Sequence, residues 1–186
     1  MSFFRKPIVA LLLSAVLIAA STLLSVNVKF GSECEKVIDG FHDGVYYDGQ
    51  MHESIASQLR EIRGCADEIA DIAIKNNIDA EELQWASDGV RYGLLYSDSE
   101  ASYLYYCYED LLDEVNSTVR ELENSLCSEE DMAAVYACLD EIDAAKELIE
   151  HAGYNETVRE FNRTHLRFPA EFLGQLAGVD FPEQFS

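Results

Sequence analysis

The stretch from Tyr154 to Pro169 reads YNETVREFNRTHLRFP, and its residue order is the most distinctive in the chain. Tyr154, Val158 and Phe161 are spaced by four and then three positions, which places them on one face of an α-helix. A residue before proline is pushed out of the helical conformation, so the helix should stop at Phe168-Pro169. The stretch therefore predicts a helix that packs against the other helices and ends in a short C-terminal segment.

Two amide side chains lie on the neighbouring face of this predicted helix. Asn155 and Asn162 are seven positions apart, so the helical repeat brings them to the same side. Buried amides need hydrogen-bond partners. We hypothesise that both asparagines hold the aromatic C-terminal tail against the helices.

Upstream of this stretch, apolar residues recur with helical spacing. The clearest seam steps by 4, 3, 4, 3 and 4 positions, which is the spacing of closely packed helices. It consists of Ile55, Leu59, Ile62, Ala66, Ile69 and Ala73. Further apolar stripes run through residues 83–94, 104–126 and 132–149, and a short final helix is expected near residues 170–177.

Polar residues at the predicted helix starts support this reading. Ser97 with Glu100 resembles a capping box, and Ser128 precedes three acidic residues that suit the first turn of a helix. Residues 30–53 contain four glycines and predict a helix with a broken middle. No convincing strand pattern is present. The fold class predicted is all-α, an antiparallel bundle of three to four long helices preceded by one N-terminal transmembrane helix.

The N-terminal segment from Pro7 to Val28 contains no charged residue over 22 positions, which is long enough to span a hydrocarbon core. Arg5 and Lys6 precede it. A cleaved signal peptide fits the same pattern, with Ala19-Ala20-Ser21 as a cleavage site. Apolar residues continue beyond that site to Val28, which favours an uncleaved anchor.

The charge asymmetry across this segment predicts its orientation. Basic residues before a membrane segment stay in the cytoplasm, and acidic residues dominate beyond it. We therefore expect residues 1–6 in the cytoplasm, residues 7–28 in the membrane, and residues 29–186 as an acidic extracytoplasmic helical-bundle domain.

The chain carries 35 acidic and 13 basic residues, a formal net charge of −22. Three of the basic residues precede residue 30 and no acidic residue does, so ten bases face 35 acids in the remainder. Such a surface repels phosphate backbones, and nucleic-acid binding is not expected.

The sequence offers little catalytic chemistry. It has no Gly-x-Ser-x-Gly, no phosphate-binding glycine loop and no HExxH. Asp39 and His42 approach the Glu-x-x-His pattern of di-iron bundles, and Glu147 and His151 have a spacing that suits a single metal contact. Solvated side chains are the favoured explanation of both pairs. We expect no enzyme, no cofactor and no metal site.

Five cysteines are present, none in a CxxC pair, and most suit small buried side chains. They are Cys34, Cys65, Cys107, Cys127 and Cys138. In an extracytoplasmic domain a disulfide could form, but the spacing does not identify a pair.

The C-terminal residues resemble the signature of the bacterial LemA family, over about residues 139–185. The residues that carry the resemblance are Tyr154, Asn155, Val158, Phe161, Asn162, Phe168, Pro169 and Gly178, followed by terminal aromatics. The chain departs from the family pattern where a Tyr-Pro stretch is replaced by Leu126-Cys127-Ser128-Glu129, which makes it similar to a divergent member.

The resemblance implies one membrane segment followed by long helices outside the cytoplasm, and it supplies no catalytic residue. We expect a membrane-anchored structural or protein-interaction module at the cell envelope. The alternative is a ligand- or metal-ion-binding sensor domain at the same place.

Overall fold

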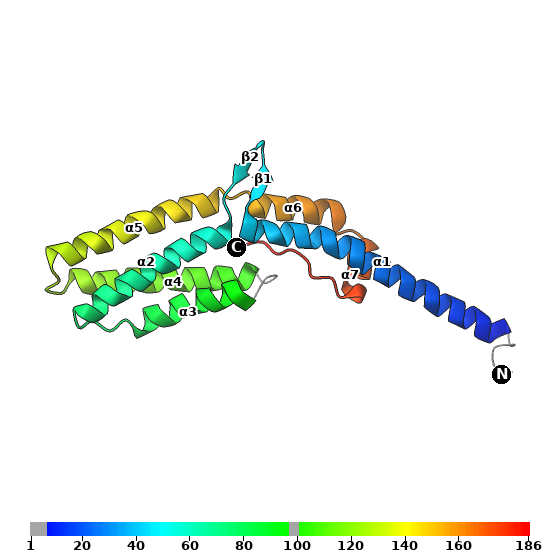
Figure 1. Cartoon of the computed structure of the whole chain (residues 1–186), viewed down its shortest axis with the longest axis horizontal. Coiled ribbons are helices and arrows are strands. Elements are labelled where there is room, and N and C mark those ends of the chain that lie inside the picture. The colour runs from blue at the N-terminus through cyan, green and yellow to red at the C-terminus, as the bar shows by residue number, and fades with distance from the viewer. Residues whose placement is uncertain (1–6, 97–100) are drawn as a thin grey trace.

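The computed structural model describes residues 7–96 and 101–186 and is mostly helical (Figure 1). In chain order the elements are α1 (Pro7–Asp43), β1 (Val45–Tyr47), β2 (Gln50–His52), α2 (Ile55–Lys75), α3 (Glu81–Tyr96), α4 (Ala101–Glu123), α5 (Glu129–Glu150), α6 (Tyr154–His165) and α7 (Ala170–Ala177).

Helices α2 to α5 lie side by side along their lengths and form the thick part of the molecule (Figure 1). Helix α2 is central, because it packs against α5, α3 and α4. All six residues of the predicted seam on α2 are buried. The apolar stripe of α2 is therefore buried against the neighbouring helices, as its spacing predicts.

Helix α1 is one continuous helix that leaves this body and extends far beyond it (Figure 1). Its outer part is exposed, with Val16 at 64% and Leu17 at 68%, whereas Cys34 and Phe41 near its inner end are buried. Over its most apolar 18 residues the mean hydropathy is 2.2 and none of the window is buried. Among the described residues it alone is long and apolar enough to cross a membrane.

The expectation of a helix with a broken middle over residues 30–53 is wrong up to Asp43, because α1 runs through Gly31 and Gly40 without interruption. Close packing explains Gly40. A Cβ there would lie 2.6 Å from Cγ1 of Val45, so a larger residue would push the following strand away.

A two-stranded antiparallel hairpin follows α1 and corrects the all-α prediction. Val45 pairs with His52 and Tyr47 with Gln50. Its turn uses Asp48 and Gly49, both with positive φ, as short hairpins require. Only Val45 of the two strands is buried, so the sequence shows no alternating apolar pattern that would reveal them.

The predicted helix cap at Ser128 is confirmed, and Ser54 forms a second cap that was not predicted. The Ser54 and Ser128 hydroxyls accept hydrogen bonds from the backbone N–H groups of Ser57 and Asp131. The predicted cap formed by Ser97 with Glu100 falls on residues 97–100, which lie outside the described residues.

Candidate functional site

The predicted signature stretch forms α6, which begins at Tyr154 directly after Gly153. Gly153 has φ +71°, so it breaks the chain direction between α5 and α6. Tyr154, Val158 and Phe161 are all buried, as their spacing predicts. Helix α6 lies along the inner half of α1 (Figure 1).

Asn155 binds the C-terminal tail (residues 178–186) through a pair of hydrogen bonds. Its Nδ2 donates to the carbonyl oxygen of Phe185 at 2.9 Å, and its Oδ1 accepts from the backbone N–H of Phe185 at 2.8 Å. The amide thus satisfies both backbone groups of one tail residue, as a neighbouring strand would. The hypothesis of a clamp on the tail holds at this residue.

The Phe185 side chain is buried among aromatic rings that come from two helices. Its centroid lies 5.7 Å from that of Phe41 on α1, and 5.1 Å and 5.6 Å from those of Tyr105 and Tyr108 on α4. Offset and edge-on ring contacts at these distances are favourable beyond the area they bury. The last aromatic residue therefore joins α1, α4 and α6.

Tyr154 adds a third hydrogen bond to the tail. Its hydroxyl donates to the carbonyl oxygen of Glu183 at 3.1 Å. Burial, and secondarily the charge of Glu183, raises the pKa of the Tyr154 phenol, so the hydroxyl keeps its proton and its donor role at physiological pH.

Asn162 does not perform the predicted role. Its Oδ1 is buried and has no hydrogen-bond partner among the described residues, and its side chain makes no recorded bond to the tail. The helical repeat was right, but the tail hydrogen-bonds α6 near its first turn, whereas beside Phe161 it packs against α6 through the apolar side chain of Val179. The hypothesis of a clamp is therefore wrong for Asn162.

The remaining signature residues lie around α7. Phe168 is 85% exposed, and the Phe168–Pro169 peptide bond is cis. Pro169 directly precedes α7, and Gly178 ends it with φ +69°, a conformation that suits glycine. These residues turn the chain twice, so that α7 and the tail come back onto α1.

A second aromatic cluster holds the tail against α1 and α6. The Phe30 ring stacks on Phe161 and meets Phe181 edge-on, both at 6.1 Å between centroids. Cys34 and Val179 are buried in the same cluster. Burial, with a smaller effect of Glu33, raises the pKa of the Cys34 thiol to about 11, so it remains an uncharged packing group.

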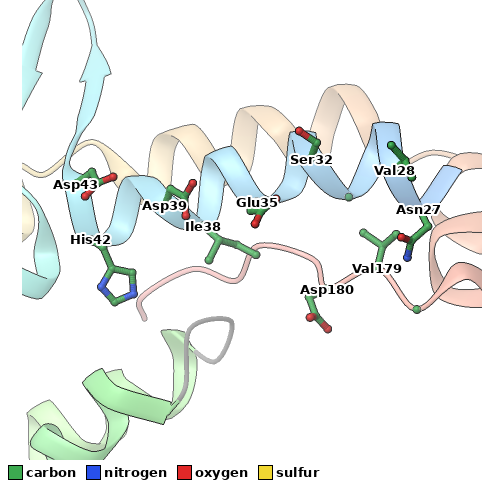
Figure 2. Close-up of a pocket in the computed structure, with 12 residues that line it drawn as sticks. Asn27, Val28, Ser32, Glu35, Ile38, Asp39, His42, Asp43, Val179 and Asp180 are labelled. Carbon is green, nitrogen blue, oxygen red and sulfur yellow. The ribbon is translucent and has the colours of Figure 1, made fainter. Parts of the chain in front are cut away.

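An acidic groove of about 660 Å³ lies between α1 and the tail. Figure 2 shows Ile38 pointing from α1 toward the tail and Val179 pointing from the tail toward α1. The groove is also lined by acidic side chains from both segments and by one histidine, namely Glu35, Asp39, Asp43, Asp180 and His42. We refer to it as the acidic groove.

The acidic groove contains one of the two acid–histidine pairs noted in the sequence. Asp39 and His42 both line it, whereas Glu147 and His151 lie at the end of α5, away from it. Among the described residues, no group of three or more His, Cys, Asp or Glu side chains is arranged to hold a metal ion. Sequence reasoning missed the groove, because Asp180 reaches α1 only through the return of the tail.

The structure also brings two of the cysteines together. Cys65 on α2 and Cys138 on α5 are both buried and lie close enough for each to affect the pKa of the other, and the Cys65 thiol donates to Oε2 of Glu141 at 3.3 Å. Burial is the main cause that raises the pKa of Cys65 to about 12 and that of Cys138 to about 11.

Comparison of the chain with protein-family models, curated proteins and solved structures finds no match. The resemblance to the LemA family therefore stays a prediction from the signature residues.

Proposed function

We propose that the chain is a membrane-anchored helical module with a structural or protein-interaction role at the cell envelope. The observation that carries this proposal is the continuity of α1. The same helix has an exposed apolar outer part and an inner part buried in the domain, through Cys34 and Phe41. A continuous helix transmits position and orientation, so the domain would be held rigidly at a set distance from the bilayer rather than tethered by a flexible linker.

The orientation follows from charge. In this proposal residues 1–6 lie in the cytoplasm, residues 7–28 span the membrane, and residues 29–186 form an antiparallel bundle outside it. The LemA resemblance supports the same plan. The role we propose is structural or protein-binding rather than enzymatic.

Membrane extraction and protease accessibility test the anchor and its orientation. The full chain should stay in the membrane pellet after alkaline carbonate washing, and the variant Leu13→Arg with Leu17→Arg should be released, because each central charge opposes insertion by about 3 kcal/mol. Protease added to intact spheroplasts should digest an epitope fused after Ser186. An epitope that becomes accessible only after lysis would overturn the orientation.

A surface for a protein partner is available on α3 and α4. Trp85 on α3 and Tyr106 on α4 are exposed at 70% and 69%, although Tyr108, two positions further along α4, is buried. Exposed aromatic side chains are frequent at binding surfaces. A photo-crosslinking residue at Tyr106 should capture a defined partner in native membranes. The same residue at Leu126, which is fully exposed in the distant α4–α5 turn, is the control.

A second candidate function rests on the acidic groove, which has the size and charge for a small organic cation. Its carboxylates come from α1 and from the tail, so a bound cation would join both segments. A ligand of the folded state stabilises it by about 2.7 kcal/mol at a hundred times its Kd. Spermidine should therefore raise the melting temperature of the full chain in detergent. The shift should shrink in the variant Asp39→Asn with Asp43→Asn, and an equal shift with sodium chloride at matched ionic strength would refute specific binding.

A further inference from the structure

Helix α7 exposes an apolar stripe that the domain does not cover. Phe172 and Leu176 are four positions apart on the same face, and they are 53% and 58% exposed. Phe168 lies just before α7, ahead of Pro169, and is 85% exposed. Large apolar side chains grouped on one face usually mark a surface that binds another apolar phase. We call Phe168, Phe172 and Leu176 the α7 stripe.

The opposite face of α7 is fixed on α1. The Nδ2 of Asn27 donates to the carbonyl oxygen of Ala177 at 2.8 Å. At Gly174 a Cβ would lie 3.2 Å from the Phe30 ring and 2.9 Å from that of Phe181, so α7 approaches α1 closely. The α7 stripe therefore has a defined position relative to α1.

That position coincides with the end of the apolar part of α1. The helix begins at Pro7, and at 1.5 Å per residue the hydrocarbon core of about 30 Å is crossed by about 20 residues, up to Val26. Asn27 lies in the last turn of the proposed span of residues 7–28 and Phe30 follows that span, so α7 is held where α1 leaves the hydrocarbon core. Figure 1 shows α7 beside α1, between the outer part of that helix and the four-helix body. On α1 itself, Leu24 and Val28 are also exposed at this level.

Some basic side chains lie close to α7 in the sequence. Residues 161–170 contain Arg163, His165 and Arg167 and no acidic residue, although Glu160 pairs with Arg163 at 2.7 Å and Glu171 lies in the first turn of α7. Lys29 lies on α1 at the same level, next to Phe30. Basic side chains beside aromatic and aliphatic ones are the composition of helices that lie in the headgroup region of anionic membranes.

From this placement we infer that α7 is a second membrane contact, with the α7 stripe inserted at the boundary between lipid headgroups and acyl chains. This inference rests on the proposed anchoring by α1. A second contact beside the anchor prevents the domain from pivoting about α1, and it fixes which face of the domain is turned away from the bilayer. Arg167 and Lys29 would contact lipid phosphates, whereas Arg163 is paired with Glu160.

Tryptophan fluorescence in nanodiscs tests the inference on the full chain. Trp85 is the single native tryptophan and is exposed on α3, so Trp85→Phe removes it without disturbing the core. In that background Phe172→Trp places the probe in the α7 stripe, Leu17→Trp places it in the proposed anchor, and Tyr106→Trp places it on α4, away from the bilayer. Each variant is compared in anionic nanodiscs without and with brominated lipids, brominated near the top of the acyl chains for Phe172→Trp and Tyr106→Trp and near the chain ends for Leu17→Trp.

We expect brominated lipid to remove about half or more of the emission of Phe172→Trp, as for a side chain at the membrane interface, and to leave Tyr106→Trp unchanged. If Leu17→Trp is quenched while Phe172→Trp is not, α7 lies off the membrane and the inference fails while the anchor stands. If neither is quenched, the anchor and the inference both fail. Shielding of Phe172→Trp from acrylamide without quenching by brominated lipid would indicate a protein partner on α7 and would also overturn the inference.

Discussion

Replacing Asn155 by alanine removes the side chain that binds the backbone of Phe185. Both hydrogen bonds of that pair are lost, one at 2.9 Å and one at 2.8 Å. The N–H and C=O groups of Phe185 then have no partner at a position where the residue is only 3% exposed. The fold of α6 itself should persist, because alanine favours helix.

The size of the effect follows from the two bonds. Each neutral hydrogen bond contributes about 0.5–1.5 kcal/mol net, so release of the tail should become easier by about 1–3 kcal/mol. That free energy corresponds to an increase of about 5- to 150-fold in the population of the detached tail. The rings of Phe41, Tyr105 and Tyr108 still hold the Phe185 side chain, so the tail should loosen without unfolding the domain.

Hydrogen exchange of the tail amides in the full chain measures this directly. Exchange of residues 183–186 should accelerate by the factor given above in Asn155→Ala, while amides in the centre of α2 should keep their rates. Carboxypeptidase digestion provides a second readout, since the enzyme reaches Phe185 only after the tail detaches.

Two asparagine variants serve as controls. Asn162→Ala should leave tail exchange unchanged, because Asn162 makes no recorded bond to the tail, and so should Asn116→Ala, whose Nδ2 donates only to the carbonyl of Leu112 on its own helix. Unchanged tail exchange in Asn155→Ala would refute the clamp. Faster tail exchange in Asn162→Ala would restore the rejected role of that residue.

Further expectations concern the packed helices. Gly153→Ala should lower the free energy of unfolding by about 1–2 kcal/mol in chemical denaturation, because φ +71° suits glycine and a Cβ would meet Tyr47 at 3.1 Å. Ser128→Ala should cost about 1 kcal/mol through loss of the α5 cap, measured in the same way. The thiol of Cys65, with its pKa raised to about 12, should be alkylated in the folded chain at pH 8 roughly a thousandfold more slowly than after denaturation; equal rates by mass spectrometry would contradict this. Hydrogen bonds from Lys75 and Asn76 hold the pKa of the Asp131 carboxyl below its usual value, so its stabilising effect is complete above about pH 4 and is lost as the pH falls through the folded value. Asp131→Asn should therefore flatten the acid limb of a plot of melting temperature against pH, and an unchanged limb would count against this bond.

Local patterns predicted much of the helical structure correctly. The seam on α2 and the caps at Ser54 and Ser128 follow from residues within a few positions of one another, where helical spacing and capping chemistry apply directly. Ser54 was not singled out from the sequence, but its cap follows the rule that predicted Ser128. The apolar segment that begins at Pro7 was equally plain, because charge and hydropathy need no partner to be recognised.

The hairpin and the continuity of α1 were missed for one shared reason. Glycines were taken as breaks in the helix, yet Gly40 lies inside α1, where its lack of a side chain admits Val45. The hairpin depends on positive φ at Asp48 and Gly49, and it buries only Val45, so no alternating pattern marks it. Both features depend on packing between segments. The residue pattern of a single segment carries no information about such packing.

The stretch from Tyr154 to Pro169 separates what the sequence determines from what only the tertiary structure decides. By itself the sequence determined that it is a helix with one apolar face, that two amides share a neighbouring face, and that proline ends it, because these are consequences of the helical repeat and of backbone sterics. Only the tertiary structure decided that Asn155 binds Phe185, 30 residues away, while Asn162 does not, because the tail crosses α6 near its first turn. The acidic groove and the position of α7 on α1 arise in the same way, from a chain reversal whose two sides meet only after folding.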